Sequence, residues 1–490
     1  MKKTLAKLDS HLTPNASAIR RCEAALECKD RGDHDGAREA MEPFWKQLGE
    51  RPNTAGLHPQ VAAQTLLTAG ILTRWIGSKN QSKEAQETAR DLISEATTFY
   101  ESVGDVRKVA EARTELAYCY WREGSFDNAR IMFTEALEKL TTEGNTRANA
   151  LLGLSVVEWS ASRYSKALEI LTENASLFKK VTNHTTRGTY HNQLAMVLRK
   201  LATPENRVSQ SRRAIREYEQ ADHYFKLARN RVFRANVLNN VGNILRELSR
   251  LNEAHKHLEE ARRLAVGVRD KILVAQFDDS RARLLLAMER PAEAEQITRG
   301  TVRVLERSGH FSLLADLLLT HGTALARLHK TDQAQFTFQR AIEVSLQVDA
   351  LNKAGMAALT MIEEIERLSP DVLSHAYEQA GEWLADCQSH DLLLRFKAAG
   401  KKLALELRRA TKTGEVAQLL FNQPCDLSEE LLAFERSLIR GALAKVDGRI
   451  SHAASLLSVG RQRLAYILET RHRDLLTERT PIHRRAGKKN

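Results

Sequence analysis

The stretch that decides the fold reads Leu238-Asn-Asn-Val-Gly-Asn-Ile-Leu-Arg-Glu-Leu-Ser-Arg-Leu-Asn-Glu-Ala254. Within it, Gly242 is followed twelve positions later by Ala254, and Leu258 and Ala261 come next. Two antiparallel helices approach closely only where their side chains are small, so Gly or Ala is expected at each crossing point. The stretch therefore predicts two packed helices joined by a short turn at residues 248–250.

The same spacing of small and large residues recurs along the chain. Stronger copies carry Ala117, Ala129, Phe133 and Ala136; Ala282 and Ala294; and Gly322, Ala334, Phe338 and Ala341. Weaker copies carry Ser155, Ala167 and Leu171, and Ala195, Ala221, Phe225 and Ala228, the latter lengthened by an insertion around residues 203–220. Because one helix pair cannot bury its apolar face alone, we expect Phe133, Leu258 and Phe338 to fill the space between successive pairs.

This pattern resembles the tetratricopeptide repeat family over roughly residues 15–350. Second-helix alanines at positions 89, 129, 254, 294 and 334 include several steps of 40 residues. The usual repeat has about 34 residues, so the resemblance implies longer helices or turns here. The expected fold class is all-α, a tetratricopeptide-like α-solenoid of helix pairs followed by a small helix-turn-helix domain.

Composition agrees with ordered helices. The chain of 490 residues is 42% hydrophobic and 28% charged, with only 9 prolines and 6% aromatic residues. Such a composition favours helices over sheets or disorder. We expect residues 351–410 to cap or continue the solenoid, 411–427 to form a linker, 428–476 a helix-turn-helix, and 477–490 a basic tail.

Positive charge is concentrated at the C-terminal end. The formal net charge is +12, and residues 428–490 hold 13 Lys and Arg against 7 Asp and Glu. About half of the excess charge therefore lies in the last 63 residues. Such a concentration at one end indicates a polyanionic partner there.

The segment from Ser428 reads as three short helices. The first carries a broad apolar face, the second is expected to be capped by Ser451, and the third runs from Arg461 through Leu464 and Leu468. The segment resembles the Fis-type C-terminal domain of bacterial transcription regulators, on these residues: Glu435, Ala442, Leu443, Gly448, Ala453, Ala454, Leu457, Val459, Arg461, Leu464 and Leu468. The family usually has Gly where this chain has Ser458 and Ser where it has Gly460. The resemblance implies a DNA reader and a homodimer through residues 431–445.

In that module, Leu464 and Leu468 are expected to face inward at i and i+4. The DNA-binding candidates on the third helix are then Arg461, Gln462, Arg463 and Tyr466, because Arg can read guanine and Gln adenine. Candidates for phosphate contacts are Lys445, Arg449, Arg471, Arg473 and the tail residues Arg484, Arg485, Lys488 and Lys489. The alternative is that these arginines form an ordinary solvated helix face.

Repeat solenoids bind ligands on the face lined by the first helices. The partner-binding candidates on that face are Asn192, Arg199, Asn236, Asn239, Asn243, Arg246 and Arg283. Their amide and guanidinium groups could hold the backbone or carboxylate of a protein or peptide. The alternative for any one of them is an ordinary solvent-facing polar side chain.

The sequence carries no pattern typical of catalysis. No phosphate-binding G-x-x-x-x-G-K-[ST] occurs, and neither G-x-S-x-G nor H-E-x-x-H occurs. His255 and His257 are two positions apart and point in different directions on a helix. The five cysteines have no C-x-x-C spacing: Cys22, Cys28, Cys119, Cys387 and Cys425. We expect no enzyme, cofactor or metal site.

Neither an apolar signal segment nor a run of about 20 apolar residues is visible, so we expect a cytoplasmic protein without membrane contact. The sequence leaves two hypotheses. One is a transcription regulator whose solenoid binds a protein or peptide and whose C-terminal module reads DNA. The other is a protein-interaction scaffold whose C-terminal helices dimerise without binding DNA.

Overall fold

The computed structural model describes residues 11–79, 83–141, 144–385, 387, 389–412 and 427–478. Contacts divide the chain into two units, Met1–Arg367 with Gln379–Gln388, and Leu368–Glu378 with Ser389–Asn490. Every regular element in the described ranges is a helix. Among the helices so described, none has the length and apolar character needed to cross a membrane.

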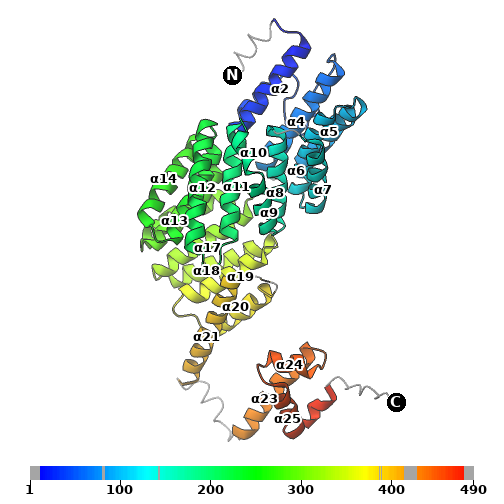
Figure 1. Ribbon diagram of the computed structural model, residues 1–490. Coiled ribbons are helices and arrows are strands. Elements are labelled where there is room, and N and C mark those ends of the chain that lie inside the picture. Colours follow the sequence, from blue (N-terminus) through cyan, green and yellow to red (C-terminus); the bar gives the residue numbers. More distant parts are fainter. Residues whose placement is uncertain are drawn as a thin grey trace, which may run out of the picture. The chain divides into compact units, whose positions relative to one another are not determined.

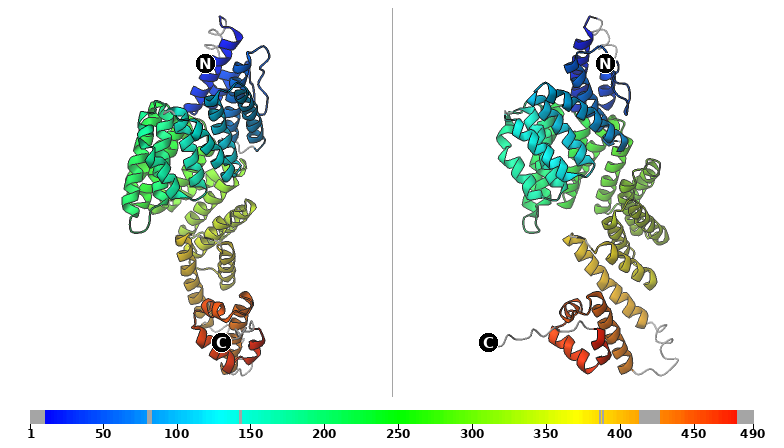
Figure 2. Two further views of the ribbon diagram at one scale, coloured as in Figure 1. Left: turned by 45° about the vertical axis from the view of Figure 1, so that its right-hand side comes forward. Right: turned by 90° about the vertical axis from the view of Figure 1, so that its right-hand side faces the viewer.

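The first unit is a stack of antiparallel helix pairs, which confirms the predicted tetratricopeptide-like α-solenoid (Figures 1 and 2). Its N-terminal helices are α2 (Pro14–Asp30), α3 (His34–Met41), α4 (Pro59–Lys79), α5 (Lys83–Ser102), α6 (Val106–Arg122), α7 (Phe126–Lys139), α8 (Asn145–Ser160), α9 (Tyr164–Glu173) and α10 (Ala175–Lys180). The stack continues with α11 (His184–Lys200), α12 (Arg207–Leu227), α13 (Arg231–Glu247), α14 (Leu251–Gly267), α15 (Lys271–Ala287), α16 (Pro291–Glu306), α17 (Phe311–Arg327), α18 (Thr331–Gln347) and α19 (Leu351–Glu364).

From α13 to α19 the helices begin every 20 residues, so a pair repeats every 40 residues. The turn before α13 and each turn between these helices hold one residue in the left-handed region: Arg229, Ser249, Arg269, Glu289, Gly309, His329 and Asp349. In the turn after α13, the amide of Arg250 donates to the Leu245 carbonyl at 2.8 Å and that of Ser249 to the Arg246 carbonyl at 3.0 Å. This is the Schellman arrangement, which ends one helix and aims the chain back along the next.

Small residues let the helices of a pair approach, as the sequence predicts. A Cβ on Gly242 would lie 2.6 Å from the Leu258 side chain, and one on Gly322 would lie 2.8 Å from the Phe338 ring. These two large residues therefore pack against the first helix of their own pair, and Leu258 also belongs to a buried cluster that includes Leu284 of α15 in the next pair. Phe133 does pack between pairs, against Gly153 of the next first helix.

The insertion around residues 203–220 is absorbed by a longer helix. Helix α12 has 21 residues, four more than α14 or α18. Residues 201–206 form the connection before it.

The turn after α2 contacts helices much later in the chain. The Asp30 carbonyl accepts hydrogen bonds from Thr185 Oγ1 and Asn230 Nδ2, both at 2.8 Å, and the Asp30 carboxylate accepts one from Asn183 Nδ2 at 2.6 Å. Asn183 and Asn230 also cap α11 and α13. The first helix pair is therefore hydrogen-bonded to the starts of α11 and α13.

Helix α20 (Pro370–Trp383) spans the division between the units, and α21 (His390–Lys412) belongs to the second unit. Leu384, just after α20, packs against Gly355 of α19. Tyr377 stacks on Phe396 of α21 with 4.5 Å between ring centroids. Most of the predicted linker, residues 413–426, and most of the predicted tail, residues 479–490, lie outside the described residues.

The C-terminal module consists of α23 (Leu427–Lys445), α24 (Ile450–Leu456), α25 (Arg461–Thr470) and the 3₁₀-helix η1 (Arg473–Glu478). Helix α24 has Arg449 at its N-cap and no side-chain cap, so the predicted cap at Ser451 is wrong: Ser451 lies in the first turn of the helix. The buried core is formed by Ile439, Ala442, Leu443, Ala453, Ala454, Leu464, Leu468 and Leu475. The module therefore has its own small core.

Ser458 occupies the left-handed position of the turn between α24 and α25, with φ of 53°. A side chain in this conformation is disfavoured relative to glycine. We expect Ser458→Gly to raise the free energy of unfolding of the module by about 0.5–1 kcal/mol, since relief of strain exceeds the added entropy of the unfolded chain. Urea unfolding monitored by amide exchange in α23–α25 measures the gain. Gly448→Ala, at φ of 75°, should lower stability instead. Equal stability of wild type and Ser458→Gly would contradict the assignment of strain.

Candidate ligand groove and nucleic-acid interface

All seven predicted partner-binding residues lie on first helices of their pairs. Asn192 and Arg199 are on α11, Arg283 is on α15, and α13 carries Asn236, Asn239, Asn243 and Arg246. Asn243 donates to Ser280 Oγ of α15 at 3.2 Å, and Arg283 donates to Thr320 Oγ1 of α17 at 3.2 Å. These bonds link successive first helices side by side, so the residues share one face of the solenoid.

A cavity of about 370 Å³ opens near the C-terminal ends of α8 and α11. It is lined by Trp159, Met196, Arg199, Lys200, Tyr218 and Asn240. Of the predicted residues, only Arg199 lines it, where its guanidinium also donates to Glu247 at 2.9 Å. The cavity lining therefore combines cationic side chains with an indole, a thioether and an amide.

Six buried polar atoms on α8, α11 and α13 have no hydrogen-bond partner in the described structure: Ser155 Oγ, Glu158 Oε2, Trp159 Nε1, Gln193 Oε1, Asn239 Oδ1 and Arg246 Nε. Asn239 is only 5% exposed. An unsatisfied buried polar group costs about 1–3 kcal/mol, so such atoms are uncommon and are often found at functional sites. This part of the solenoid face offers both donors and acceptors to a polar ligand.

Burial shapes the electrostatics of this face. It lowers the pKa of the Arg246 guanidinium, and it raises the pKa of the Tyr218 phenol to about 12. Burial also raises the pKa of Asp279, although Arg283 at 2.8 Å opposes the effect. Arg283 is thus neutralised by a close carboxylate, whereas Arg246 has no ion-pair partner within 4 Å in the described structure.

Sequence reasoning missed Trp159, Gln193, Met196, Lys200, Tyr218 and Asn240. A signal for Trp159 exists in the repeat. Counted from the small residue of each first helix, Trp159 occupies the position that Arg199 and Arg246 occupy in α11 and α13. Tyr218 could not be found in this way, because it lies on the second helix α12.

Two arginines on this face should respond oppositely to mutation. We expect Arg246→Met to raise the free energy of unfolding by about 1 kcal/mol, because a half-buried cation without an ion-pair partner is replaced by an apolar chain of similar length. Arg283→Met should lower stability by about 1–2 kcal/mol, since it leaves Asp279 buried without its cation. Thermal and urea unfolding of both full-length variants measure the effects. A loss of stability in Arg246→Met equal to that in Arg283→Met would contradict a binding role for Arg246.

In the C-terminal module, Leu464 and Leu468 are buried, as their spacing predicts. Arg461, Gln462, Arg463 and Tyr466 are exposed on α25, and the Tyr466 ring is 65% exposed. Neither Arg461 nor Arg463 has a described carboxylate within 4 Å. Both side chains therefore extend from the first turn of α25 while the opposite side of the helix anchors it.

The residues predicted to contact phosphates fall into two groups, according to whether the side chain has a partner within the protein. Lys445 and Arg449 are exposed, and no ion pair joins either of them to a described acid. Arg471 lies 3.5 Å from the Glu435 carboxylate, and Arg473 donates to the Glu469 carbonyl at 2.7 Å. Arg484, Arg485, Lys488 and Lys489 lie outside the described residues. The exposed first group lies around the turn from α23 to α24.

Comparison with protein families finds one match, between residues 73–247 and the family described as soluble NSF attachment protein, SNAP. This match covers less than half of the chain. A search among curated proteins finds no significant match.

Solved structures of low sequence identity resemble the chain. The apo form of RapI is 12% identical, with a TM-score of 0.49, and covers 71% of this chain and 99% of its own. The apo quorum sensor NprR from B. thuringiensis is 11% identical, with a TM-score of 0.48, and covers 70% and 91%.

A signal transduction ATPase with numerous domains and a tetratricopeptide repeat sensor, from Pyrococcus horikoshii, is 13% identical, with a TM-score of 0.49, and covers 81% and 67%. The fold itself is established by the 40-residue helix pairs and their small crossing residues: the chain is a tetratricopeptide-like α-solenoid.

Proposed function

We propose that this protein is a DNA-binding transcription regulator of the bacterial cytoplasm. Its solenoid face binds a protein or peptide, and α24, the turn at Ser458 and α25 form a Fis-type helix-turn-helix that reads DNA. The observation that carries the DNA proposal is the exposure of Arg461, Gln462 and Arg463 on a helix that Leu464 and Leu468 hold in place.

In this proposal the first turn of α25 enters the major groove. Arg461 or Arg463 can donate two hydrogen bonds to guanine, and Gln462 can pair with adenine in the same way. Lys445 and Arg449 contact phosphates and fix the orientation of the module on the duplex. The residues provide binding and positioning only, and we assign no catalytic role to any of them.

The solenoid face would recognise an extended polypeptide through groups of both polarities. Asn236, Asn239 and Asn240 offer amides to the peptide backbone, while Arg199 and Arg246 offer cations to a carboxylate. The unpaired Oδ1 of Asn239 and Nε of Arg246 support this role, because both polar atoms lack a hydrogen-bond partner at this face of the described structure.

The first test measures binding of the full-length protein to a randomised duplex DNA pool across a range of salt concentrations. Each phosphate contact adds about 0.9 to the slope of log affinity against log salt, so a steep negative slope is expected. Enrichment of particular sequences from the pool would show base reading. Absence of binding even at low salt would contradict the proposal.

A scaffold that dimerises without binding DNA is the second candidate. It is favoured by the exposed apolar side chains of the module, Leu432 at 40%, Leu438 at 49% and Tyr466 at 65%. A homodimer through residues 431–445 would suit either function, because paired DNA readers also need two recognition helices about 34 Å apart. A dimer in sedimentation equilibrium without DNA binding at low salt would select the scaffold.

A further inference from the structure

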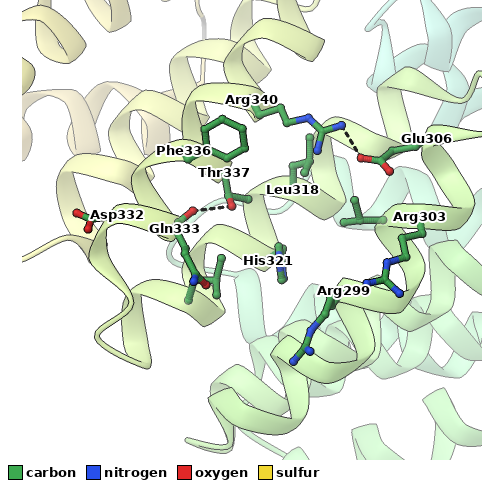
Figure 3. Close-up of a pocket in the computed structure, with 12 residues that line it drawn as sticks. Arg299, Arg303, Glu306, Leu318, His321, Asp332, Gln333, Phe336, Thr337 and Arg340 are labelled. Atoms are coloured by element: carbon green, nitrogen blue, oxygen red, sulfur yellow. Dashed lines mark hydrogen bonds and ion pairs between the residues drawn. The ribbon is translucent and has the colours of Figure 1, made fainter.

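A second surface lies on the other helices of the pairs and is independent of the proposed function. A groove of about 500 Å³ runs between α16 and α18 over α17 (Figure 3). Val302, Leu318 and Leu325 contribute apolar side chains to it. Arg299 and Arg303 of α16 lie on one side, and Phe336 and Arg340 of α18 lie on the other.

A break in the repeat accompanies this groove. Four residues after the small residue of each second helix, the other repeats carry a large apolar residue: Phe133, Leu171, Phe225, Leu258 and Phe338. Helix α16 carries Thr298 there instead. Thr298 is fully buried, and its hydroxyl lies 2.8 Å from His321 Nδ1 at the groove. Helix α16 therefore lacks the large apolar packing residue that the other repeats carry at this position.

Phe336 is the second departure from the repeat. Its ring is 70% exposed, more than any other large hydrophobic residue in the described structure. The equivalent positions of the other second helices carry Ile131, Glu169, His223, Lys256 and Gln296. Since four of these five are polar, the solenoid does not need an aromatic ring at this position.

Gly300 is the third departure. It lies in the middle of α16, and a Cβ built on it meets no atom within 4 Å. Glycine in a helix costs about 1 kcal/mol relative to alanine, yet packing within this chain does not require it. It borders a second groove of about 660 Å³, which is lined in part by Val266, Val274, Ile297 and Val304. A glycine between two apolar grooves permits another backbone to approach closely.

The charges around these grooves are unbalanced. Arg299 and Arg340 are paired with Glu295 and Glu306. Among the described residues, the cations Arg269, Lys271 and Arg303 line the two grooves without a carboxylate within 4 Å. In all, the cations that line the two grooves are Arg262, Arg269, Lys271, Arg281, Arg299, Arg303 and Arg340, and the acids are Asp270, Asp278, Glu306 and Asp332. The surplus is positive, so an acidic partner is complementary to this surface.

We propose that the surface of α14, α16 and α18 around Gly300, which we term the α16 surface, binds an amphipathic acidic helix of another protein. The apolar side of that helix occupies the two grooves and contacts Phe336 and Val304. Its acidic residues lie against Arg303 and the other unpaired cations. This is the helix-in-groove mode, in which side chains at i, i+3, i+4 and i+7 provide the contacts.

The test uses full-length protein and a fluorescent 18-residue helical peptide with leucines at i, i+3, i+4 and i+7 and glutamates at most other positions. Anisotropy should show saturable binding that weakens with salt. Phe336→Glu and Arg303→Glu should each reduce affinity by about tenfold or more, as expected for central interface residues. The matched control Ile131→Glu changes the equivalent exposed position on α7 and should leave affinity unchanged. Arg216→Glu, at an exposed position on α12 away from this surface, is the control for Arg303→Glu.

Several outcomes would overturn the proposal. These are absence of saturable binding, equal binding of a peptide with lysine in place of glutamate, and equal losses in Phe336→Glu and Ile131→Glu. Thermal unfolding verifies that the variants fold, which is expected because the changed side chains are exposed. A dimer in sedimentation velocity that Phe336→Glu dissociates and the acidic peptide cannot displace would instead identify a second copy of this chain as the occupant.

Discussion

Replacing Phe338 by alanine is expected to lower the free energy of unfolding of the last repeats by about 3–5 kcal/mol. The ring is fully buried, and its atoms lie against Gly322 of the partner helix. Truncation leaves a cavity that the pair cannot close, since glycine offers no side chain to fill it. In a solenoid each pair contacts only its neighbours, so the loss should be largest in α17, α18 and α19. Hydrogen exchange of their amides measures it locally.

Phe336→Ala is the matched control for this prediction. It removes the same ring two residues away on the same helix, but from a side chain that is 70% exposed. Its effect on stability should stay within about 0.5 kcal/mol. Similar losses in the two variants would show that burial against Gly322 does not govern the stability of this pair.

The sequence predicted the solenoid because its decisive signal is local. A small residue on one helix and a large residue on the next, such as Gly242 and Leu258, are close in both sequence and space. Whether a large residue of a second helix packs against its own pair or against the next pair was less predictable. The same spacing places Phe338 against Gly322 of its own pair, whereas Phe133 contacts both Tyr118 of its own pair and Gly153 of the next one.

Long-range contacts could not be predicted from the repeats. The bonds from Asp30 to Thr185 and Asn230 depend on the accumulated rotation of all the intervening pairs. A small change of rotation per repeat alters that sum and leaves the repeat pattern itself unchanged. Asn183 and Asn230 cap α11 and α13 in the structure, and nothing in the repeat pattern indicates their second role in holding the first helix pair.

The candidate sites were predicted to different extents. Helical spacing alone correctly places Leu464 and Leu468 inside the module and leaves Arg461 and Arg463 outside. On the solenoid face, position in the repeat selected Asn239 and Arg246, but residue type could not distinguish Arg246 from the ion-paired Arg283. The partner of Arg283 is Asp279, which lies one turn away on the same helix and resembles a surface acid in the sequence.

The double substitution Arg461→Ala/Arg463→Ala is expected to reduce the affinity of the full-length protein for its enriched DNA sequences by at least about tenfold. A bidentate arginine–guanine contact is worth about 1–3 kcal/mol, and removal of two cations also weakens phosphate attraction. Because both side chains are exposed and the anchoring leucines are untouched, the module should keep its stability. Binding to duplexes enriched from the randomised pool, at two salt concentrations, provides the measurement.

Arg212→Ala/Arg216→Ala removes the same charge from exposed positions on α12 and is the matched control. It should leave DNA affinity nearly unchanged, whereas Lys445→Ala/Arg449→Ala should weaken binding uniformly across sequences and reduce the salt slope by about one per residue. These patterns separate base reading from phosphate attraction. If the Arg461→Ala/Arg463→Ala protein still prefers the enriched sequences as strongly as wild type, α25 does not read the bases, and the exposed arginines of its first turn contribute only nonspecific charge.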